Sequence, residues 1–452
     1  MKRLCCILIC AAMALSLCAC GFGNLKNVEL PPIPQVTKAV VTPKPSYVPA
    51  TTPEPEIVPT PEPSPEPTPE IVAKEEPIGL DGQVIVNFKH TEYEQYDPEE
   101  GTQRILLFAY DSPHVVIEGH PEATAVLNGQ LAFMDESFYI GGNEGDGNGF
   151  HGMLELAEDN YAYVRQSGKS KLPLEFSSTR TVRTERIDRS VVSFVFSYSD
   201  YTGGSGNNYS DVGAVFNAET GELLRLEDLS SNYEALKKRL VHELVVLTTT
   251  DKSLYEHVYI DYMHNDYYKT LGKLLRPGAW YFDEDGLVFV SSLYELGPYI
   301  AGLAVFHVPY SKFSDVIDAK WLPNARQESG KIRAAALDEQ PEGSVEYLDR
   351  VEADRRGQEI CLLVEGTVYD VKLSRVSYNE KTDKFETQQE LWFCSEMKDA
   401  AVQLVTKIPE GVPDLMLRYT DKEGKSYSRL ITVSEEDGSF QLVKKKDAAA
   451  LG

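Results

Sequence analysis

The sequence predicts a region of mixed strands and helices, followed by a small all-β sandwich. Between residues 84 and 320, short apolar stretches of strand length alternate with segments whose apolar residues recur at helical intervals. From residue 345 onward only short strand-like stretches remain, and turn sequences separate them about every ten residues. Roughly 370 residues follow the N-terminal signal and linker described below, which is enough for two or three domains with cores of their own.

The first twenty residues have the layout of a secretory signal. A short basic start precedes an apolar run at residues 4–17, which is too short for a stable membrane span. Ala19 directly before Cys20 is the lipobox pattern of bacterial lipoproteins, in which Cys20 becomes the lipidated first residue of the mature chain. An ordinary cleaved signal with incidental cysteines is the alternative. The pattern predicts a protein that is lipid-anchored at the outer, extracellular face of the cell membrane.

Residues 21–80 form a segment rich in proline and glutamate, which we expect to be a disordered linker. More than half of the 26 prolines of the chain lie between Pro31 and Pro77. Proline fixes its own φ and removes a backbone donor, so the segment favours extended polyproline II over helix or sheet. At about 3.1 Å per residue, the proline-rich part from Pro31 to Pro77 would span up to roughly 140 Å. Such a spacer suits a thick Gram-positive wall.

The chain is strongly acidic, with a formal net charge of −26. This charge repels nucleic acid and anionic phosphate surfaces, so we expect no nucleic-acid partner, and it attracts basic proteins. Solubility alone is the simpler explanation of the charge. Outside the signal only Cys361 and Cys394 remain among the cysteines. In an exported protein these two could form a disulfide, and two buried thiols are the alternative.

The region before residue 320 is expected to contain both strands and helices. Strands are expected at 84–86, 104–110, 115–117, 180–186, 191–198 and 212–217, and helices at 121–134, 231–247 and 253–275. Ser231 and Glu234 have the spacing of a capping box at the start of the second helix. The third helix is rich in tyrosine, and Tyr259 and Tyr262 are candidate ligand contacts because a tyrosine stripe suits recognition. Packing in the core is the alternative for these tyrosines.

Two acidic stretches are weak candidates for metal sites. The glycine-rich segment 141–152 carries Asp146 and Asn148, but it lacks the spaced oxygen ligands of an EF-hand loop, so a flexible loop is expected. Asp283 and Asp285 precede a glycine between two apolar runs, which is the pattern of a hairpin turn. We therefore expect no metal, no cofactor and no catalytic residue in this chain.

The segment 280–310 resembles a known exported domain. Its marks are Asp285-Gly286-Leu287-Val288-Phe289, Tyr294-Glu295-Leu296-Gly297-Pro298-Tyr299, Ala301-Gly302 and Val308-Pro309-Tyr310. These residues are similar to the RsiV-like exported domain family, found as the C-terminal domain of the anti-sigma factor RsiV and beside the catalytic domain of the peptidoglycan deacetylase PdaC. The likeness spans about residues 83–314 and is specific in its last thirty residues.

The resemblance implies an α+β domain, in which helices pack on an antiparallel sheet. In the anti-sigma factor this domain binds lysozyme, so Tyr294, Glu295 and Tyr299 become candidate ligand contacts, with a structural role as the alternative. Only three residues precede the apolar run, which disfavours a cytoplasmic anti-sigma segment. The deacetylase ligands are also missing, because the last histidine of the chain is His307.

The C-terminal part reads as strands and turns. Strands are expected at 360–364, 367–376, 385–393, 414–420, 426–433 and 440–443. Short strands at this spacing are typical of a small sandwich, which could be immunoglobulin-like. The predicted organisation is therefore a signal peptide (1–20), a linker (21–80), the N-terminal α+β part of the RsiV-like module (81–190), its C-terminal domain (191–320), a connector (321–344) and a β-sandwich (345–447).

We expect a non-catalytic binding or sensing module for a ligand of the cell envelope. Wall glycan and a basic lytic protein such as lysozyme are the expected partners, and contact with the membrane is through the lipid anchor only. An enzyme that acts on the cell wall, or an accessory subunit of one, is the first alternative. The sequence shows no HExxH motif, GxSxG elbow or catalytic cysteine and histidine pattern. A structural protein that binds another envelope protein is the second alternative.

Overall fold

The computed structural model describes most of the chain after residue 81. The described residues are 82–141, 149–167, 174–204, 206–259, 266–336, 346–354, 357–407, 412–434 and 438–444. Every described residue belongs to one compact unit, within residues 74–452. The signal peptide, Cys20 and the linker lie outside the described residues, as do Asp146, Asn148 and Tyr262. Among the described helices, none combines the length and the apolar character needed to cross a bilayer.

The largest element is a ten-stranded sheet. Its strands are β1 (Val84–Tyr96), β2 (Arg104–Ile117), β3 (Phe176–Ile187), β4 (Val191–Tyr201), β5 (Asn208–Asn217), β12 (Thr367–Asn379), β13 (Lys384–Lys398), β15 (Leu415–Thr420), β16 (Ser426–Val433) and β17 (Phe440–Lys444). They lie in the order β17-β16-β15-β12-β13-β1-β2-β3-β4-β5. Each pair of neighbours is antiparallel except β2 and β3, which are parallel. The sheet is therefore predominantly antiparallel, as expected.

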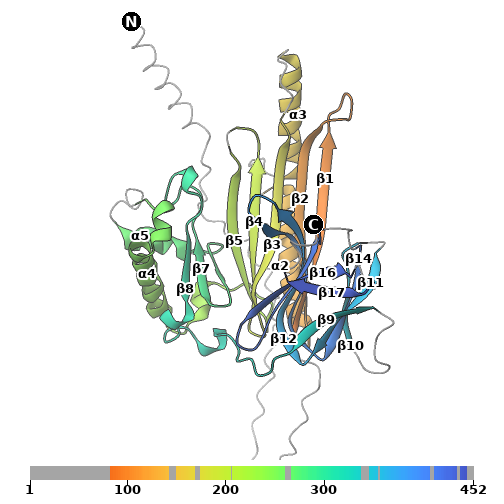
Figure 1. The fold of residues 1–452 in the computed structure, drawn as a ribbon. Coiled ribbons are helices and arrows are strands. Elements are labelled where there is room, and N and C mark those ends of the chain that lie inside the picture. Colours follow the sequence, from red (N-terminus) through yellow and green to blue (C-terminus); the bar gives the residue numbers. More distant parts are fainter. Residues whose placement is uncertain are drawn as a thin grey trace, which may run out of the picture. The chain divides into compact units, whose positions relative to one another are not determined.

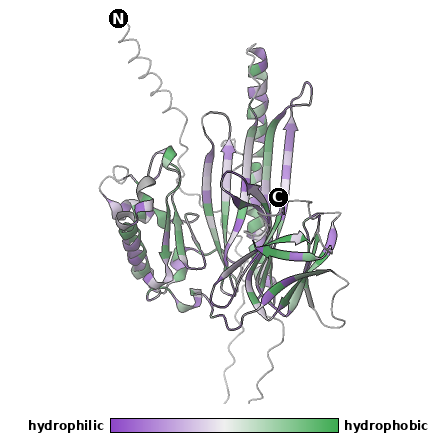
Figure 2. Cartoon of the chain, viewed as in Figure 1, coloured by the Kyte–Doolittle hydropathy of each residue, from purple (hydrophilic) through white to green (hydrophobic). Residues whose placement is uncertain are grey.

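Two helices pack on the first five strands (Figure 1), and they are α2 (Pro121–Ile140) and α3 (Phe150–Gln166). Leu127 of α2 shares a buried cluster with Phe194 and Phe196 of β4. Met153 and Tyr161 of α3 pack in a second cluster, at the start of β2 and β3. The sequence predicted α2 but not α3, and the loop predicted over 141–152 is wrong at its end, because α3 begins at Phe150. Figure 2 shows β1 becoming hydrophilic toward its end, where most of its side chains are no longer buried.

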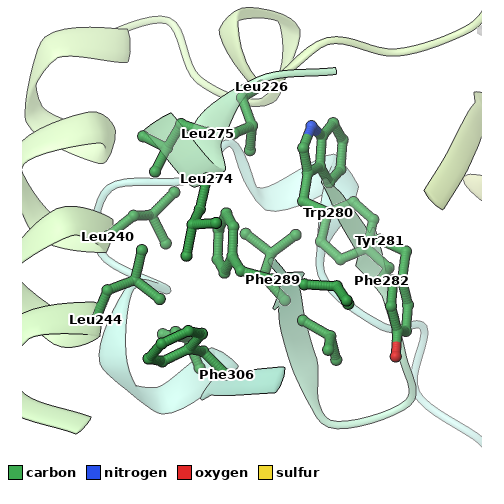
Figure 3. Close-up of a cluster of buried hydrophobic side chains, with 14 of the residues drawn as sticks. Leu226, Leu240, Leu244, Leu274, Leu275, Trp280, Tyr281, Phe282, Phe289 and Phe306 are labelled. Atoms are coloured by element: carbon green, nitrogen blue, oxygen red, sulfur yellow. The ribbon is translucent and has the colours of Figure 1, made fainter. Parts of the chain in front are cut away.

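The opposite face of β4 and β5 packs against a small α/β layer. This layer contains α4 (Tyr233–Thr250), α5 (Tyr267–Leu271), β6 (Trp280–Phe282), β7 (Gly286–Val290) and β8 (Val305–Pro309). Figure 3 shows its core, in which Leu240 and Leu244 of α4 point toward Phe289 and Phe306. Val195 of β4 belongs to the same cluster. Because β4 is buried on both faces, its apolar run is continuous, as the sequence of 191–198 predicted.

Single-turn 3₁₀ helices join these elements. They are η1 (Leu226–Leu229), η2 (Lys252–Glu256), η4 (Gly272–Leu275), η5 (Tyr299–Ala301), η6 (Tyr310–Lys312) and η7 (Ala319–Trp321). The long helix predicted over 253–275 is wrong, because the described part of this segment consists of η2, α5 and η4. The physical reason is that the backbone N–H of Tyr259 donates to the carbonyl of Leu296 at 2.8 Å, which takes it out of any helical ladder.

Helix α4 begins within two residues of its predicted start, but its N-terminus is capped differently. Asn232 is the N-cap, and its side chain accepts a hydrogen bond from the N–H of Ala235 at 3.3 Å. The capping box predicted for Ser231 and Glu234 is wrong. Ser231 instead donates through its backbone N–H and its hydroxyl to the carboxylate of Asp318, at 3.0 and 3.1 Å.

The C-terminal strands form a two-layer β structure. Its smaller sheet is made of β9 (Lys331–Ala336), β10 (Glu346–Glu352), β11 (Gln358–Glu365) and β14 (Ala400–Thr406), in the order β10-β14-β11-β9. Its apolar core lies between this sheet and β12, β13, β15 and β16 of the large sheet. The fold is thus α+β with a sandwich, as predicted. The sandwich shares its larger sheet with the α+β part, because β13 pairs with β1. The segment predicted as a connector contributes β9.

The two cysteines of the folded part are buried in different apolar clusters. Cys361 lies on β11 in a small cluster with Ala335 and Leu363, whereas Cys394 lies on β13 inside the sandwich core. The structure does not join these two described residues by a disulfide. Of the two alternatives left open by the sequence, two buried thiols is the one observed.

Candidate recognition surface

The loop of residues 291–304 connects β7 to β8 and carries most of the predicted ligand contacts. Leu296 is buried beneath it. Gly297 packs so closely that a Cβ atom there would lie 2.7 Å from the carbonyl oxygen of His257 and 3.0 Å from the ring of Tyr259. The glycine is therefore required for the loop to lie against 257–259. This contact places Tyr259 beside the loop, although 38 residues separate it from Gly297 in the sequence.

An ion pair with two parallel hydrogen bonds holds the first half of this loop. Both terminal nitrogens of Arg276 donate to the two carboxylate oxygens of Glu295, each at 2.8 Å. The same carboxylate accepts from the N–H of Ser292 at 2.8 Å, and Arg276 also donates to the Ser292 hydroxyl at 2.9 Å. Only 17% of the Glu295 side chain is exposed. A forked pair of this kind fixes orientation as well as adding energy, so Glu295 acts on the loop backbone.

Tyr294 is presented to solvent by this arrangement. Its φ is 63°, in the left-handed region that a residue other than glycine or asparagine adopts only at a cost. The neighbouring Glu295 is fixed by its ion pair, so the loop enforces this conformation. Half of the Tyr294 side chain is exposed. Unfavourable backbone conformations of this kind concentrate at binding sites.

Two further tyrosines extend the exposed aromatic area. The Tyr299 ring lies 5.9 Å from that of Tyr294 and 6.1 Å from that of Tyr209, measured between centroids. The hydroxyl of Tyr299 donates to the backbone carbonyl of Asn207 at 2.6 Å, which ties the loop to the start of β5. Ile300, next in the chain, is 90% exposed. We name Tyr209, Tyr259, Tyr294, Tyr299 and Ile300 the tyrosine surface.

The tyrosine surface has the chemistry of a recognition site. Its side chains offer flat aromatic faces and hydroxyl groups, and a backbone carbonyl holds the hydroxyl of Tyr299, so this ring loses few rotamers when a partner binds. An isoleucine with 90% exposure is unusual for a core-forming residue type. Grouped exposed apolar side chains, rather than single ones, indicate an interaction surface.

The structure brings together four of the five predicted ligand contacts. Tyr294, Tyr299 and Tyr259 are exposed or half-buried around the same loop, and Glu295 holds that loop from below. Sequence reasoning missed Tyr209, Ile300 and Arg276. Ile300 carried a usable signal, because an isoleucine between a glycine-proline bend and a glycine lies outside any strand or helix pattern. Tyr209 and Arg276 gave no such signal.

A polar cavity of about 860 Å³ lies elsewhere, among β3, β12, β13 and the segment 323–328. Its charged groups largely neutralise each other: Arg326 pairs with Asp370, and Arg189 lies 3.6 Å from Glu396. Burial raises the pKa of both Glu396 and Glu284, which line this cavity. This lining is explained by ion pairs at a junction of strands, so we place the candidate site at the tyrosine surface.

The acidic pair Asp283 and Asp285 belongs to a turn. The Asp283 carboxylate accepts from the N–H groups of Asp285 and Gly286 at 2.9 and 2.7 Å, and these bonds close the turn between β6 and β7. The hairpin predicted there is confirmed. In the described part of the chain, no group of three or more His, Cys, Asp or Glu side chains is placed to share a metal ion.

Residues 231–311 match the model of a family described as "Protein of unknown function (DUF3298)". This stretch is a DUF3298 domain. It contains α4, β6, β7, β8 and all of the tyrosine surface except Tyr209.

Two solved structures of the same family are similar to the chain. The DUF3298 family member from Bacteroides fragilis is 16% identical with a TM-score of 0.40, and the match covers 53% of this chain and 96% of that one. The DUF3298 family protein from Pseudomonas aeruginosa is 14% identical with a TM-score of 0.34, and the match covers 53% and 97%. Among curated proteins, none matches this chain.

Proposed function

We propose that this chain is a lipid-anchored extracellular protein whose DUF3298 domain is a non-catalytic binding or sensing module for a ligand of the cell envelope. The observation that carries the proposal is the tyrosine surface. Exposed and half-buried tyrosines and an isoleucine are grouped on and beside one loop, and an ion pair and hydrogen bonds to the backbone hold that loop in place. Protein interfaces are enriched in aromatic residues of this kind, which supply much of their binding energy.

The expected ligands are wall glycan and a basic lytic protein such as lysozyme. Aromatic faces suit both the apolar faces of sugar rings and the side chains of a protein. The net charge of −26 favours association with a basic protein at low ionic strength. The resemblance of 280–310 to the RsiV-like family supports the same pair of ligands.

Binding of the full chain to hen lysozyme and to purified peptidoglycan tests the proposal. We expect one of the two to bind, and we expect Tyr294→Ala and Ile300→Asp each to weaken that binding by roughly 30-fold, which corresponds to about 2 kcal/mol for a central contact. Tyr268→Ala is the matched control, because Tyr268 is 57% exposed and lies outside the tyrosine surface. Absence of binding to both ligands at low salt, or equal losses in the control, contradicts the proposal.

The anchor is tested separately. Labelling cells with a palmitate analogue is expected to mark the wild-type chain and not a Cys20→Ala variant, and the variant is expected to leave the membrane fraction. Recovery of the unlabelled wild-type chain in the cytosol contradicts the anchor without bearing on the tyrosine surface.

A further inference from the structure

One edge of the large sheet is open beside the tyrosine surface. β5 is the last strand in the order of the sheet, so no described strand pairs with its outer edge (Figure 1). The second half of that edge is covered, because the N–H of Gly213 donates to the carbonyl of Gly278 at 2.9 Å. The carbonyl of Val215 likewise accepts from the N–H of Leu224 at 2.7 Å.

The first half of the edge presents unpaired backbone groups. Successive residues of an antiparallel strand direct their N–H and C=O groups alternately toward and away from the neighbouring strand. Because Gly213 and Val215 direct theirs away from β4, Tyr209 and Asp211 do the same. Neither the N–H nor the C=O of these two residues is hydrogen-bonded to another described residue. Four backbone groups at strand spacing are thus available.

The open edge and the tyrosine surface are continuous. The Tyr209 ring belongs to the surface, and its centroid lies 6.1 Å from that of Tyr299. The Tyr299 hydroxyl is already bonded to the carbonyl of Asn207, the residue before β5. A Cβ atom at Gly302 would lie 3.1 Å from the Tyr209 hydroxyl, so the end of the loop also lies against this tyrosine. A ligand on the aromatic side chains would therefore reach the edge.

We propose that the ligand of the tyrosine surface is an extended polypeptide segment, which adds to β5 at Tyr209–Asp211 as a further strand. This inference rests on the proposed function and narrows its ligand. In strand addition the main chain supplies hydrogen bonds, and alternate side chains of the added strand fill neighbouring pockets. A wall glycan carries N–H and C=O groups only on its acetamido substituents and not along its main chain, so it does not reproduce the roughly 6.7 Å repeat of two strand residues. The open edge therefore favours a polypeptide.

The side-chain environment agrees with a short added strand. Asp211 is occupied, because it accepts from the Ser197 hydroxyl at 2.6 Å and lies 3.5 Å from Arg183. It therefore leaves no unpaired charge to bury when a strand covers it. Tyr209 and Ile300 are both exposed, and Ile300 directly follows Tyr299, whose ring packs against that of Tyr209. Aliphatic or aromatic residues at alternate positions of the partner segment are the expected match.

The test uses the full chain and a displayed library of random linear twelve-residue peptides. We expect selection to yield peptides with alternating apolar residues. In their complexes the amide hydrogens of Tyr209 and Asp211 are expected to exchange at least tenfold more slowly. N-methylation at alternate positions of a selected peptide is expected to lower its affinity at least tenfold, and N-methylation between those positions to have little effect. This readout needs no change to the protein.

Variants at Tyr209 give the matched comparison. Tyr209→Pro removes the outward N–H, and proline is tolerated on edge strands, so it is expected to lower peptide affinity at least tenfold. Tyr209→Ala also loses the ring but keeps the backbone N–H, so the proline variant is expected to bind at least tenfold more weakly than the alanine variant. An unfolding curve for each variant establishes that the fold is retained.

Three results overturn the inference. Failure of every selected peptide to protect Tyr209 and Asp211 removes the strand model. Binding of peptidoglycan at the tyrosine surface that Tyr209→Pro leaves unchanged keeps the proposed function but assigns it to a glycan. A dimer in solution that Tyr209→Pro converts to a monomer assigns the edge to a second copy of the chain.

Discussion

The backbone of Tyr294 provides a stability measurement that is independent of any ligand. Its φ of 63° costs a residue with a Cβ atom about 1–2 kcal/mol relative to glycine. A glycine in place of alanine lowers the stability of the fold by about 0.4–1 kcal/mol, because it gives the unfolded chain more conformational freedom. Tyr294→Gly and Tyr294→Ala both remove the ring and its contact with Tyr299, so that loss cancels between them. The glycine variant is therefore expected to be more stable than the alanine variant by about 0.5–1 kcal/mol.

Urea unfolding of the two variants measures this difference. Tyr268, an exposed residue within α5, is the control site. There the order is reversed, with the glycine variant less stable than the alanine variant by about 0.5–1 kcal/mol, because glycine disfavours a helix. Finding the alanine variant more stable at both sites would refute the argument that the loop enforces a left-handed conformation on Tyr294. Both variants at 294 are expected to lose ligand binding equally.

Three further predictions follow from other contacts. The hydrogen bond that His90 donates to the buried Asp111 carboxylate raises the pKa of His90 above its ordinary value. The contribution of this contact to the stability of the fold is therefore full below about pH 6.5, and it is lost as the pH rises through the raised pKa of His90 in the folded protein. At pH 5.5 the free energy of unfolding of the wild type is expected to exceed that of His90→Gln by up to about 1 kcal/mol. This limit is low because His90 is 43% exposed. At pH 9 the difference is expected to be smaller. Burial raises the pKa of the Cys394 thiol to about 12, so iodoacetamide at pH 8 is expected to label Cys394 in peptide maps only after unfolding. A double-mutant cycle to alanine at Arg276 and Glu295 is expected to give a coupling of about 1 kcal/mol, because the pair is forked and partly buried.

Each of these predictions has a clear contrary result. A pH-independent difference between the wild type and His90→Gln would remove the link between Asp111 and the histidine. Rapid labelling of Cys394 in the folded protein would place this thiol at the surface. Additive effects at Arg276 and Glu295 would mean that the ion pair does not act on the loop.

The sequence predicted those elements whose periodicity is local. β4 and α4 were recognised because continuous apolar burial and one apolar helix face each leave a pattern within a few residues. α3 has the same kind of pattern in Met153, Ala157 and Tyr161, but the glycines that precede it indicated a loop. The segment 253–275 failed for the opposite reason, because a helical pattern was broken by a tertiary hydrogen bond.

Charge patterns were a weaker guide to burial. In β3 charged residues alternate with threonine and valine, a pattern typical of a half-exposed strand, yet Arg180 is only 1% exposed. Its guanidinium lies over the rings of Tyr110, Phe138 and Phe196 at 5.2–5.4 Å, and it donates to the carbonyl of Asp111 at 2.8 Å. These partners come from three other elements, so no local window could show them. The same applies to Tyr209 and Arg276 at the candidate site.

The pairing of β1 with β13 has a consequence for how the chain is made. The Gln83 amide donates to the Cys394 sulfur, although 311 positions separate the two residues. A ribosome has therefore produced most of the polypeptide before the central ladder of the sheet can close, and contacts of such long range slow folding. Until β13 has been made, the edge of β1 that pairs with it stays exposed. Shortened products that end before residue 384 lack β13 and would keep that edge exposed, so they are expected to aggregate. The C-terminal strands are therefore required for the solubility of the first five strands.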